Sequence, residues 1–104
     1  MEVKLFDSIE EAKRILPNNE PKLVKALDKS ICIVRKEDQL ISFLNECPHQ
    51  GASLHQGTVN YLGEIVCPLH SYRFNMKTGE TAEKACKPLT LIPVVISDAV
   101  YLDV

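Results

Sequence analysis

The sequence lacks two features that would assign it to common functional classes. A membrane-spanning helix needs roughly 20 apolar residues in succession, and no such run occurs, although 45% of the 104 residues are hydrophobic. Positive charge is not in excess either, because 12 Lys and Arg oppose 14 Asp and Glu for a net charge of -2. Since nucleic-acid binding normally requires a basic surface, we expect neither a membrane span nor a nucleic-acid partner.

The first residues also lack the apolar core of a secretory signal, which is about 7 to 15 residues long. Acidic residues occur there instead, at Asp7, Glu10 and Glu11, so we expect a cytoplasmic protein. In that compartment four cysteines favour metal binding or redox chemistry over two disulfides. A chain of this length has room for one domain, and it contains no internal repeat or linker.

The N-terminal part predicts a strand, a helix and an antiparallel meander. Residues 2–6 are strand-like, and Ser8 with Glu11 has the spacing of a capping box that opens a helix. Pro17 should end that helix. The face expected to point inward consists of Ile9, Ala12, Ile15 and Leu16. Three strand-like segments follow at residues 23–27, 31–35 and 40–44.

The second half predicts loops between short strands. An uncharged loop at 47–57 precedes a strand at 64–67, and a second loop at 67–72 precedes a strand at 73–75 with a turn at 77–79. Two more strands are expected at 90–97 and 100–103. Pro93 has no N–H for a ladder, so its strand should lie at an edge there or be broken.

Two short motifs each pair a cysteine with a histidine. The first is Cys47-Pro48-His49 and the second is Cys67-Pro68-Leu69-His70, with residues 50 to 66 between them. In residue type and spacing these motifs resemble the Rieske iron-sulfur family, most closely its small soluble ferredoxins. The resemblance implies one Rieske-type 2Fe-2S cluster, bound by Cys47, His49, Cys67 and His70.

Elementary coordination chemistry agrees with this ligand set. A thiolate and an imidazole one residue apart grip a single metal poorly, but they suit two irons joined by sulfides. Replacing two thiolates by neutral imidazoles removes negative charge and raises the reduction potential. Pro48 and Pro68 should stiffen the loops, and Gly51 and Gly57 should let backbone N–H groups approach the cluster.

Other assignments of these residues remain open at this stage. Two cysteines and two histidines also suit structural zinc, but neither the C-x2-4-C nor the H-x3-5-H spacing of common zinc sites is present. A zinc-stabilised interaction module and a redox or iron-sulfur sensor are the alternatives. Outside the motifs, Cys32 reads as a small buried hydrophobic residue and Cys86 as a packed thiol. His55 reads as a surface or loop histidine.

The resemblance also implies a fold and a function. We expect an all-β protein with one short N-terminal helix, in which strands from residues 1–44 and 76–104 form a base and residues 45–75 form a cluster-binding subdomain. The protein should carry single electrons from a reductase to an oxygenase or another acceptor, without an organic substrate and without catalysis. A small subunit of a nitrite reductase is the alternative carrier. A catalytic oxygenase subunit would need two further histidines for a second iron, and only His55 is spare.

The loops further predict a potential at the low end of the Rieske range. In high-potential members each loop has an additional cysteine, and a Ser and a Tyr hydroxyl bond the cluster sulfurs. The matching positions here are Ala52 and Leu69 for the cysteines and Tyr72 for the Ser, with Ser71 one residue away from it. Fewer hydrogen bonds to sulfur leave the reduced state less stabilised.

Overall fold

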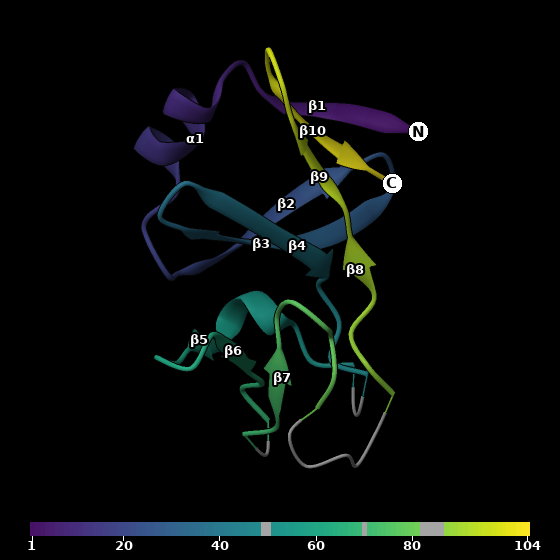
Figure 1. Ribbon diagram of the computed structural model, residues 1–104. Coiled ribbons are helices and arrows are strands. Elements are labelled where there is room, and N and C mark those ends of the chain that lie inside the picture. The colour runs from purple at the N-terminus through teal and green to yellow at the C-terminus, as the bar shows by residue number, and fades with distance from the viewer. Residues whose placement is uncertain (49–50, 70, 82–86) are drawn as a thin grey trace.

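The described residues form three antiparallel sheets arranged one after another along the longest dimension of the molecule (Figure 1). The computed structural model describes residues 1–48, 51–69, 71–81 and 87–104. Within these ranges there is one α-helix, which is short and close to the N-terminus. The predicted all-β class with a short N-terminal helix is therefore confirmed.

The first sheet joins the two ends of the chain. Its order is β1 (Glu2–Phe6), β10 (Val100–Asp103) and β9 (Val94–Ile96). Helix α1 (Ile9–Ile15) follows β1 and begins as predicted, because the Ser8 hydroxyl accepts the Glu11 backbone N–H at 3.1 Å. The Glu11 carboxylate reaches back one residue further than a capping box requires and accepts the Asp7 N–H at 3.2 Å.

The inward face of α1 differs from the prediction at one residue. Ala12 is fully buried, but Ile15 is 55% exposed. The helix ends at Ile15, and Leu16 then adopts an extended conformation, with φ -97° and ψ 118°. Because the chain changes direction there, Leu16 is buried on the inner side of the helix and is only 3% exposed.

The second sheet contains the predicted meander. It has the order β2 (Pro21–Ala26), β3 (Lys29–Lys36), β4 (Gln39–Leu44) and β8 (Leu91–Ile92). The first connection is one residue earlier than predicted: Leu27 leaves the strand, with φ 58°, to make a two-residue turn with Asp28. The chain changes sheets at Pro93, since β8 pairs with β4 and β9 pairs with β10. The predicted break at Pro93 is thus confirmed.

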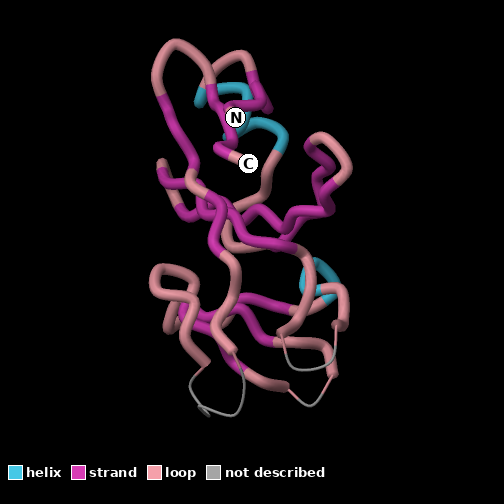
Figure 2. The backbone as a smooth tube through the Cα atoms, turned by 90° about the vertical axis from the view of Figure 1, so that its right-hand side faces the viewer, coloured by secondary structure: helices cyan, strands magenta, loops and turns pink. Residues whose placement is uncertain are grey.

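The third sheet lies at the opposite end of the molecule from the first. It consists of β5 (Thr58–Val59), β6 (Glu64–Val66) and β7 (Arg73–Asn75), and a single 3-10 turn, η1 (Leu54–Gln56), precedes it (Figures 1 and 2). The strands β6 and β7 match the prediction, whereas η1 falls in a segment expected to be loop. The division into a base and a cluster-binding subdomain at 45–75 stays a prediction.

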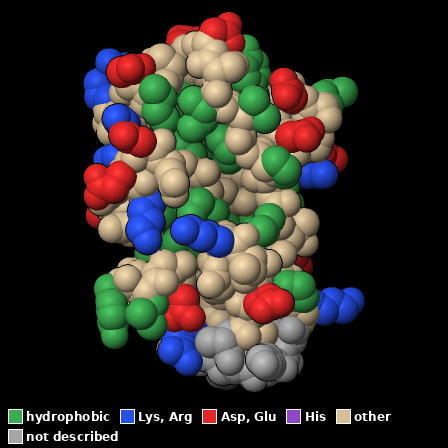
Figure 3. Space-filling model, in the orientation of Figure 1, with side chains coloured by type: hydrophobic (Ala, Val, Ile, Leu, Met, Phe, Trp, Pro, Cys, Tyr) green, Lys and Arg blue, Asp and Glu red, His purple; other side chains and the backbone are tan. Residues whose placement is uncertain are grey.

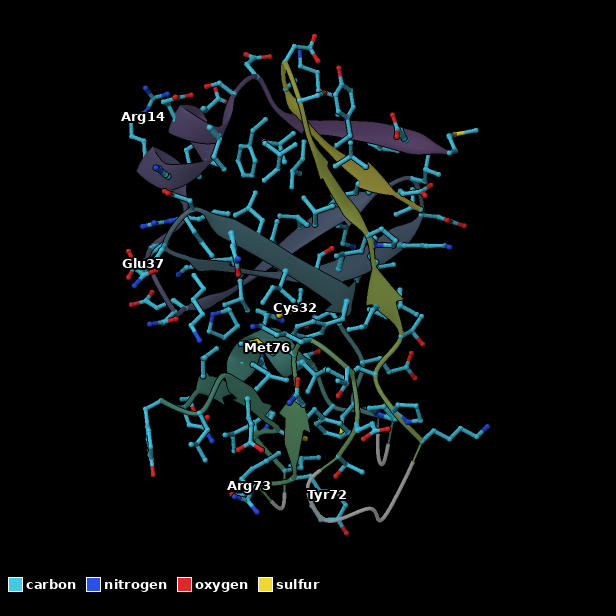
Figure 4. All side chains as sticks on the ribbon, in the orientation of Figure 1. Arg14, Cys32, Glu37, Tyr72, Arg73 and Met76 are labelled. Atoms are coloured by element: carbon cyan, nitrogen blue, oxygen red, sulfur yellow. The ribbon has the colours of Figure 1, made fainter. Side chains whose placement is uncertain are left out.

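Strand β3 is the centre of the core because both of its faces are buried. Cys32 and Val34 belong to a cluster shared with the third sheet, which we call the lower core, while Ile31 and Ile33 face the opposite side. This double burial explains the uninterrupted apolar run Ile-Cys-Ile-Val. Figure 4 shows Cys32 and Met76 near one another between the second and third sheets.

Charges of both signs are interspersed on one face of the described part of the molecule. On the face shown in Figure 3, Lys and Arg side chains alternate with Asp and Glu over most of the molecule. Among the described helices, none has the length and apolar character needed to cross a membrane.

Candidate metal centre

Two loops bring buried cysteines to the lower core from different strands. Cys47 comes soon after β4, and Cys67 comes directly after β6. The two residues are 2% and 1% exposed, neither is in a disulfide, and both belong to the same buried cluster. The fold therefore gathers two thiols that lie twenty positions apart in the sequence.

The two loops are closed in the same way. The Cys47 N–H donates to the Ala52 carbonyl at 2.8 Å, and the Cys67 N–H donates to the Tyr72 carbonyl, also at 2.8 Å. In each case a cysteine bonds the residue five positions later. In sequence, one predicted histidine ligand falls inside each closed span, although His49 and His70 themselves lie outside the described residues.

A left-handed residue precedes the closing residue in both loops. Gly51 has φ 74° and Ser71 has φ 57°, and each stands four positions after its cysteine. Glycine adopts this conformation at little cost, whereas a serine pays for contact between its Cβ and the backbone. The second loop thus holds a serine where the first loop holds the residue best suited to the turn.

The backbone N–H groups of the two loop glycines donate within the loops themselves, and the predicted approach of other loop N–H groups to the cluster stays a prediction. The Gly51 N–H donates to the Cys47 carbonyl at 2.7 Å and the Gly57 N–H donates to the Leu54 carbonyl at 2.9 Å. Gly57 is needed for close approach instead, because a Cβ there would lie 2.0 Å from the Val66 carbonyl oxygen. Gly57 lies against the backbone of the neighbouring strand β6, because the chain turns tightly from η1 into β5 at this point.

The described half of the predicted donor set fits an iron-sulfur cluster. Iron in such clusters is held by cysteine thiolates, and Cys47 and Cys67 are unbridged, buried and drawn together by two loops of like construction. Burial under apolar side chains suits a cofactor whose potential depends on exclusion of solvent. In the described ranges no three His, Cys, Asp or Glu residues gather as a metal site, and the two histidines lie outside those ranges.

Cys32 also lies in the lower core, but its environment differs from a ligand's. It is fully buried in the middle of β3, and this burial raises the pKa of its thiol to about 12. A metal ligand must be the thiolate, so Cys32 is a neutral core residue, as predicted. Cys86 lies outside the described residues.

Sequence reasoning missed the contact between Asn45 and His55. His55 lies partly buried in the short turn η1, within the predicted loop, where the Asn45 Oδ1 accepts its backbone N–H at 2.7 Å and the Asn45 Nδ2 lies 2.8 Å from its Nδ1. Asn45 itself is 9% exposed. A polar residue directly after an apolar strand is the one signal in the sequence that singles out Asn45, and nothing there pairs it with His55.

Apolar side chains lie in both loops next to the predicted histidine ligands. Leu69 is 46% exposed, and Pro48 is half-buried. Tyr72 is partly buried against the lower core, and Figure 4 shows it at the end of the molecule farthest from the first sheet. The nearest ion pair joins Arg73 and Glu64, whose charged atoms are 3.9 Å apart.

Comparison with known proteins identifies the family. The profile of the Rieske [2Fe-2S] domain matches residues 8–93. A ferredoxin component of the naphthalene 1,2-dioxygenase/salicylate 5-hydroxylase systems of Ralstonia sp is 33% identical over 75 residues, covering 72% of this chain and 68% of that protein. A carnitine monooxygenase oxygenase subunit of Acinetobacter baumannii is 30% identical over 63 residues, covering 60% of this chain. This chain spans only 17% of that subunit's length.

Solved structures give the same result for the whole fold. The ferredoxin of carbazole 1,9a-dioxygenase from Nocardioides aromaticivorans IC177 superimposes with a TM-score of 0.81 at 26% identity, covering 98% of this chain and 95% of that one. A complex of reduced oxygenase and oxidized ferredoxin from carbazole 1,9a-dioxygenase contains a chain with a TM-score of 0.80, also at 26% identity, with coverage of 98% and 92%.

The fold and the paired cysteine loops define a small iron-sulfur protein with a Rieske-type [2Fe-2S] centre. The chain belongs to the Rieske [2Fe-2S] domain family. Its cofactor is one Rieske-type 2Fe-2S cluster and its role is electron transfer.

Proposed function

We propose that Cys47, His49, Cys67 and His70 hold the cluster, with one cysteine and one histidine supplied by each loop. The observation that carries this proposal is the equivalence of the two described cysteines: both are buried in the lower core, and both begin a loop closed by the same hydrogen bond. When bound, the cluster supplies one-electron chemistry. The chain's own residues position the ligands, exclude water from the two thiols and present the loop surface to partners.

The physiological role that follows is that of the ferredoxin component of an oxygenase system. The carrier would accept one electron from a reductase and pass it to an oxygenase in the cytoplasm. Two observations support this assignment. The ferredoxin relatives match over most of their own length, and a related ferredoxin has been crystallised together with its oxygenase. Neither an organic substrate nor a nucleic acid is part of the proposal.

Partner docking is expected at the outer end of the two loops. Pro48 and Leu69 stand next to the predicted histidine ligands in sequence, and Leu69 is one of the exposed large apolar residues. Between Cys47 and Tyr72 the only formal charge is Glu64. A small, weakly charged contact of this type suits the brief encounters of electron carriers, which lie at the low end of interface sizes.

The test is reconstitution of electron flow with purified components. The anaerobically purified protein should be brown and give a reduced-state electron paramagnetic resonance signal. It should then be reduced by a ferredoxin reductase with NADH and be reoxidised by a Rieske oxygenase in the presence of that oxygenase's substrate. Leu69→Glu is the docking variant, and Leu91→Glu, on the distant strand β8 and 37% exposed, is its matched control. Reoxidation should slow in the first variant only.

A different acceptor would redirect the proposal. If the reduced protein donates to an assimilatory nitrite reductase and not to any Rieske oxygenase, the chain is a subunit of that system. A colourless protein that binds zinc in place of two irons and two sulfides per chain would contradict the ligand assignment itself. Equal slowing in the Leu69 and Leu91 variants would contradict docking at the loop end.

A further inference from the structure

Asn45 joins the two ends of the first cysteine loop through its side chain. Its own backbone is fixed to the second sheet, because its N–H donates to the Ser30 carbonyl at 3.0 Å. Its Oδ1 accepts the backbone N–H of His55 at 2.7 Å, and its Nδ2 lies 2.8 Å from the Nδ1 of the same residue. Cys47 and His49, the two predicted ligands of the first loop, lie between Asn45 and His55 in sequence. The Asn45 side chain therefore closes the base of this loop without being a ligand.

The backbone hydrogen bond decides which way the Asn45 amide faces. An N–H group requires an acceptor, so the oxygen of the amide must face the His55 backbone. The NH2 group then faces the His55 ring, and Nδ1 must be the acceptor of that bond. Such a bond requires the neutral tautomer of His55 with its proton on Nε2. A proton on Nδ1 would place two donors against each other and break the contact.

Both partners of this contact are held by larger parts of the fold. The η1 turn that contains His55 packs on β2 and β3, and Leu54 beside it is fully buried in the lower core. On the other side, Asn45 follows β4 without a break and is nearly buried. The contact thus links two well-anchored parts of the fold across the base of the loop.

We propose that Asn45 and neutral His55 form a clamp that positions the first ligand loop, with Asn45 as a positioning residue for the cluster. The inference rests on the proposed assignment of Cys47 and His49 as ligands. An electron carrier must keep its ligands in one arrangement in both oxidation states, and groups behind the ligands usually provide that rigidity. The clamp supplies such support without touching the metal.

The experiment measures iron loss from the holoprotein to the ferrous chelator bathophenanthroline disulfonate. Asn45→Ala and His55→Ala should each accelerate iron release about fivefold to tenfold, the factor expected for one or two lost hydrogen bonds. The double variant should be no faster than Asn45→Ala, because both changes break one unit. His55→Ala keeps the backbone bond and serves as the readout if Asn45→Ala does not fold. The electron paramagnetic resonance g values should shift in Asn45→Ala.

The chain offers a matched control in Asn60. Its Oδ1 accepts the Leu62 and Glu64 backbone N–H groups, each at 3.0 Å, and its Nδ2 donates to the Glu64 carboxylate at 2.9 Å. This is the same chemistry in the turn between β5 and β6, which contains no predicted ligand. Asn60→Ala should therefore leave both the release rate and the g values unchanged. Acceleration equal to that of Asn45→Ala would mean a merely structural effect and would overturn the proposal.

Nitrogen-15 NMR of histidine-labelled holoprotein tests the tautomer directly. The wild-type His55 should have its proton on Nε2, and Asn45→Asp, which places an oxygen against Nδ1, should move it to Nδ1 while iron release stays within about twofold of wild type. A proton on Nδ1 in the wild type would refute the clamp as described. Cys47→Ser separates this inference from the proposed function. Full iron and sulfide content in Cys47→Ser would refute the ligand assignment. Cluster loss in Cys47→Ser, together with iron release from Asn45→Ala at the wild-type rate, would refute the clamp alone.

Discussion

Gly51 and Ser71 occupy equivalent positions in the two cysteine loops. Each lies four residues after its cysteine and has a left-handed backbone, with φ 74° and 57°, and each precedes the residue whose carbonyl closes the loop. Two segments that differ in sequence and in histidine spacing are therefore built on one turn design. The glycine meets the design without strain, and the serine does not.

This equivalence predicts opposite effects of two substitutions. Ser71→Gly should stabilise the holoprotein or leave it unchanged, because relief of about 1 kcal/mol of backbone strain is partly offset by the greater freedom of glycine in the unfolded chain. Gly51→Ala should destabilise by about 1 to 2 kcal/mol. The cost would be conformational, since the nearest atom to an added Cβ is the Glu46 carboxylate at 3.7 Å.

Thermal unfolding of the holoprotein at a fixed scan rate checks both variants. One kcal/mol corresponds to a midpoint shift of about 4 to 8 °C in a domain of this size. A midpoint for Ser71→Gly well below that of the wild type would show that the serine side chain contributes an interaction larger than the strain.

Cysteine substitution should divide the three described thiols into two groups. Cys47→Ser and Cys67→Ser should abolish or cripple cluster assembly, because a serine hydroxyl does not replace a thiolate ligand under normal conditions. Cys32→Ala should keep two irons and two sulfides per chain and lose about 1 to 2 kcal/mol of stability at most. Iron and acid-labile sulfide analysis, with the reduced-state resonance spectrum, gives the comparison. Full cluster content in either serine variant would contradict the ligand assignment.

The buried thiol of Cys32 should make stability depend on alkaline pH. Burial raises its pKa to about 12 from the ordinary value of 9.0, so the folded protein keeps a proton that the unfolded chain releases above about pH 9. The stability associated with this proton is fully present below pH 9 and is lost progressively as the pH rises toward 12. Cys32→Ala should therefore lose less stability than the wild type over that interval.

Alkylation offers an independent measure of the same property. At pH 8 iodoacetamide should leave Cys32 unmodified in the folded holoprotein and modify it in urea, as detected by mass spectrometry of peptides. Rapid modification of Cys32 under native conditions would mean that the middle of β3 opens or that the thiol is not shielded.

The reduction potential should lie in the low part of the Rieske range, which extends from about -150 to +300 mV. The positions corresponding to the loop disulfide of high-potential relatives are Ala52 and Leu69, which cannot form one, and Tyr72 stands where those relatives have a serine. Protein-film voltammetry should give a midpoint below about 0 mV, since fewer hydrogen bonds to sulfur leave the reduced cluster less stabilised. A midpoint well above 0 mV would contradict this comparison of the loops.

Most of the features that could be predicted from the sequence depend on interactions between residues close together in the chain. The cap at Ser8, the meander and the break at Pro93 depend on neighbouring residues, on period-two burial or on a missing N–H, all of which are visible in the chain itself. The two cysteine-histidine motifs belong to this group as well, because their spacing alone is typical of the Rieske family. The cap, the strands of the meander and the break at Pro93 agree with the prediction to within two residues, whereas the ligand set stays a prediction.

Long-range packing supplied the rest. Cys47 and Cys67 share one buried cluster because the third sheet docks on β3 and β4. Ile15 is exposed and Leu16 is buried because the chain must turn there to reach the meander. The pairing of Asn45 with His55 joins the end of a strand to a turn ten residues later. Local propensity contains no term for such contacts, because their free energy exists only once the separate elements have come together.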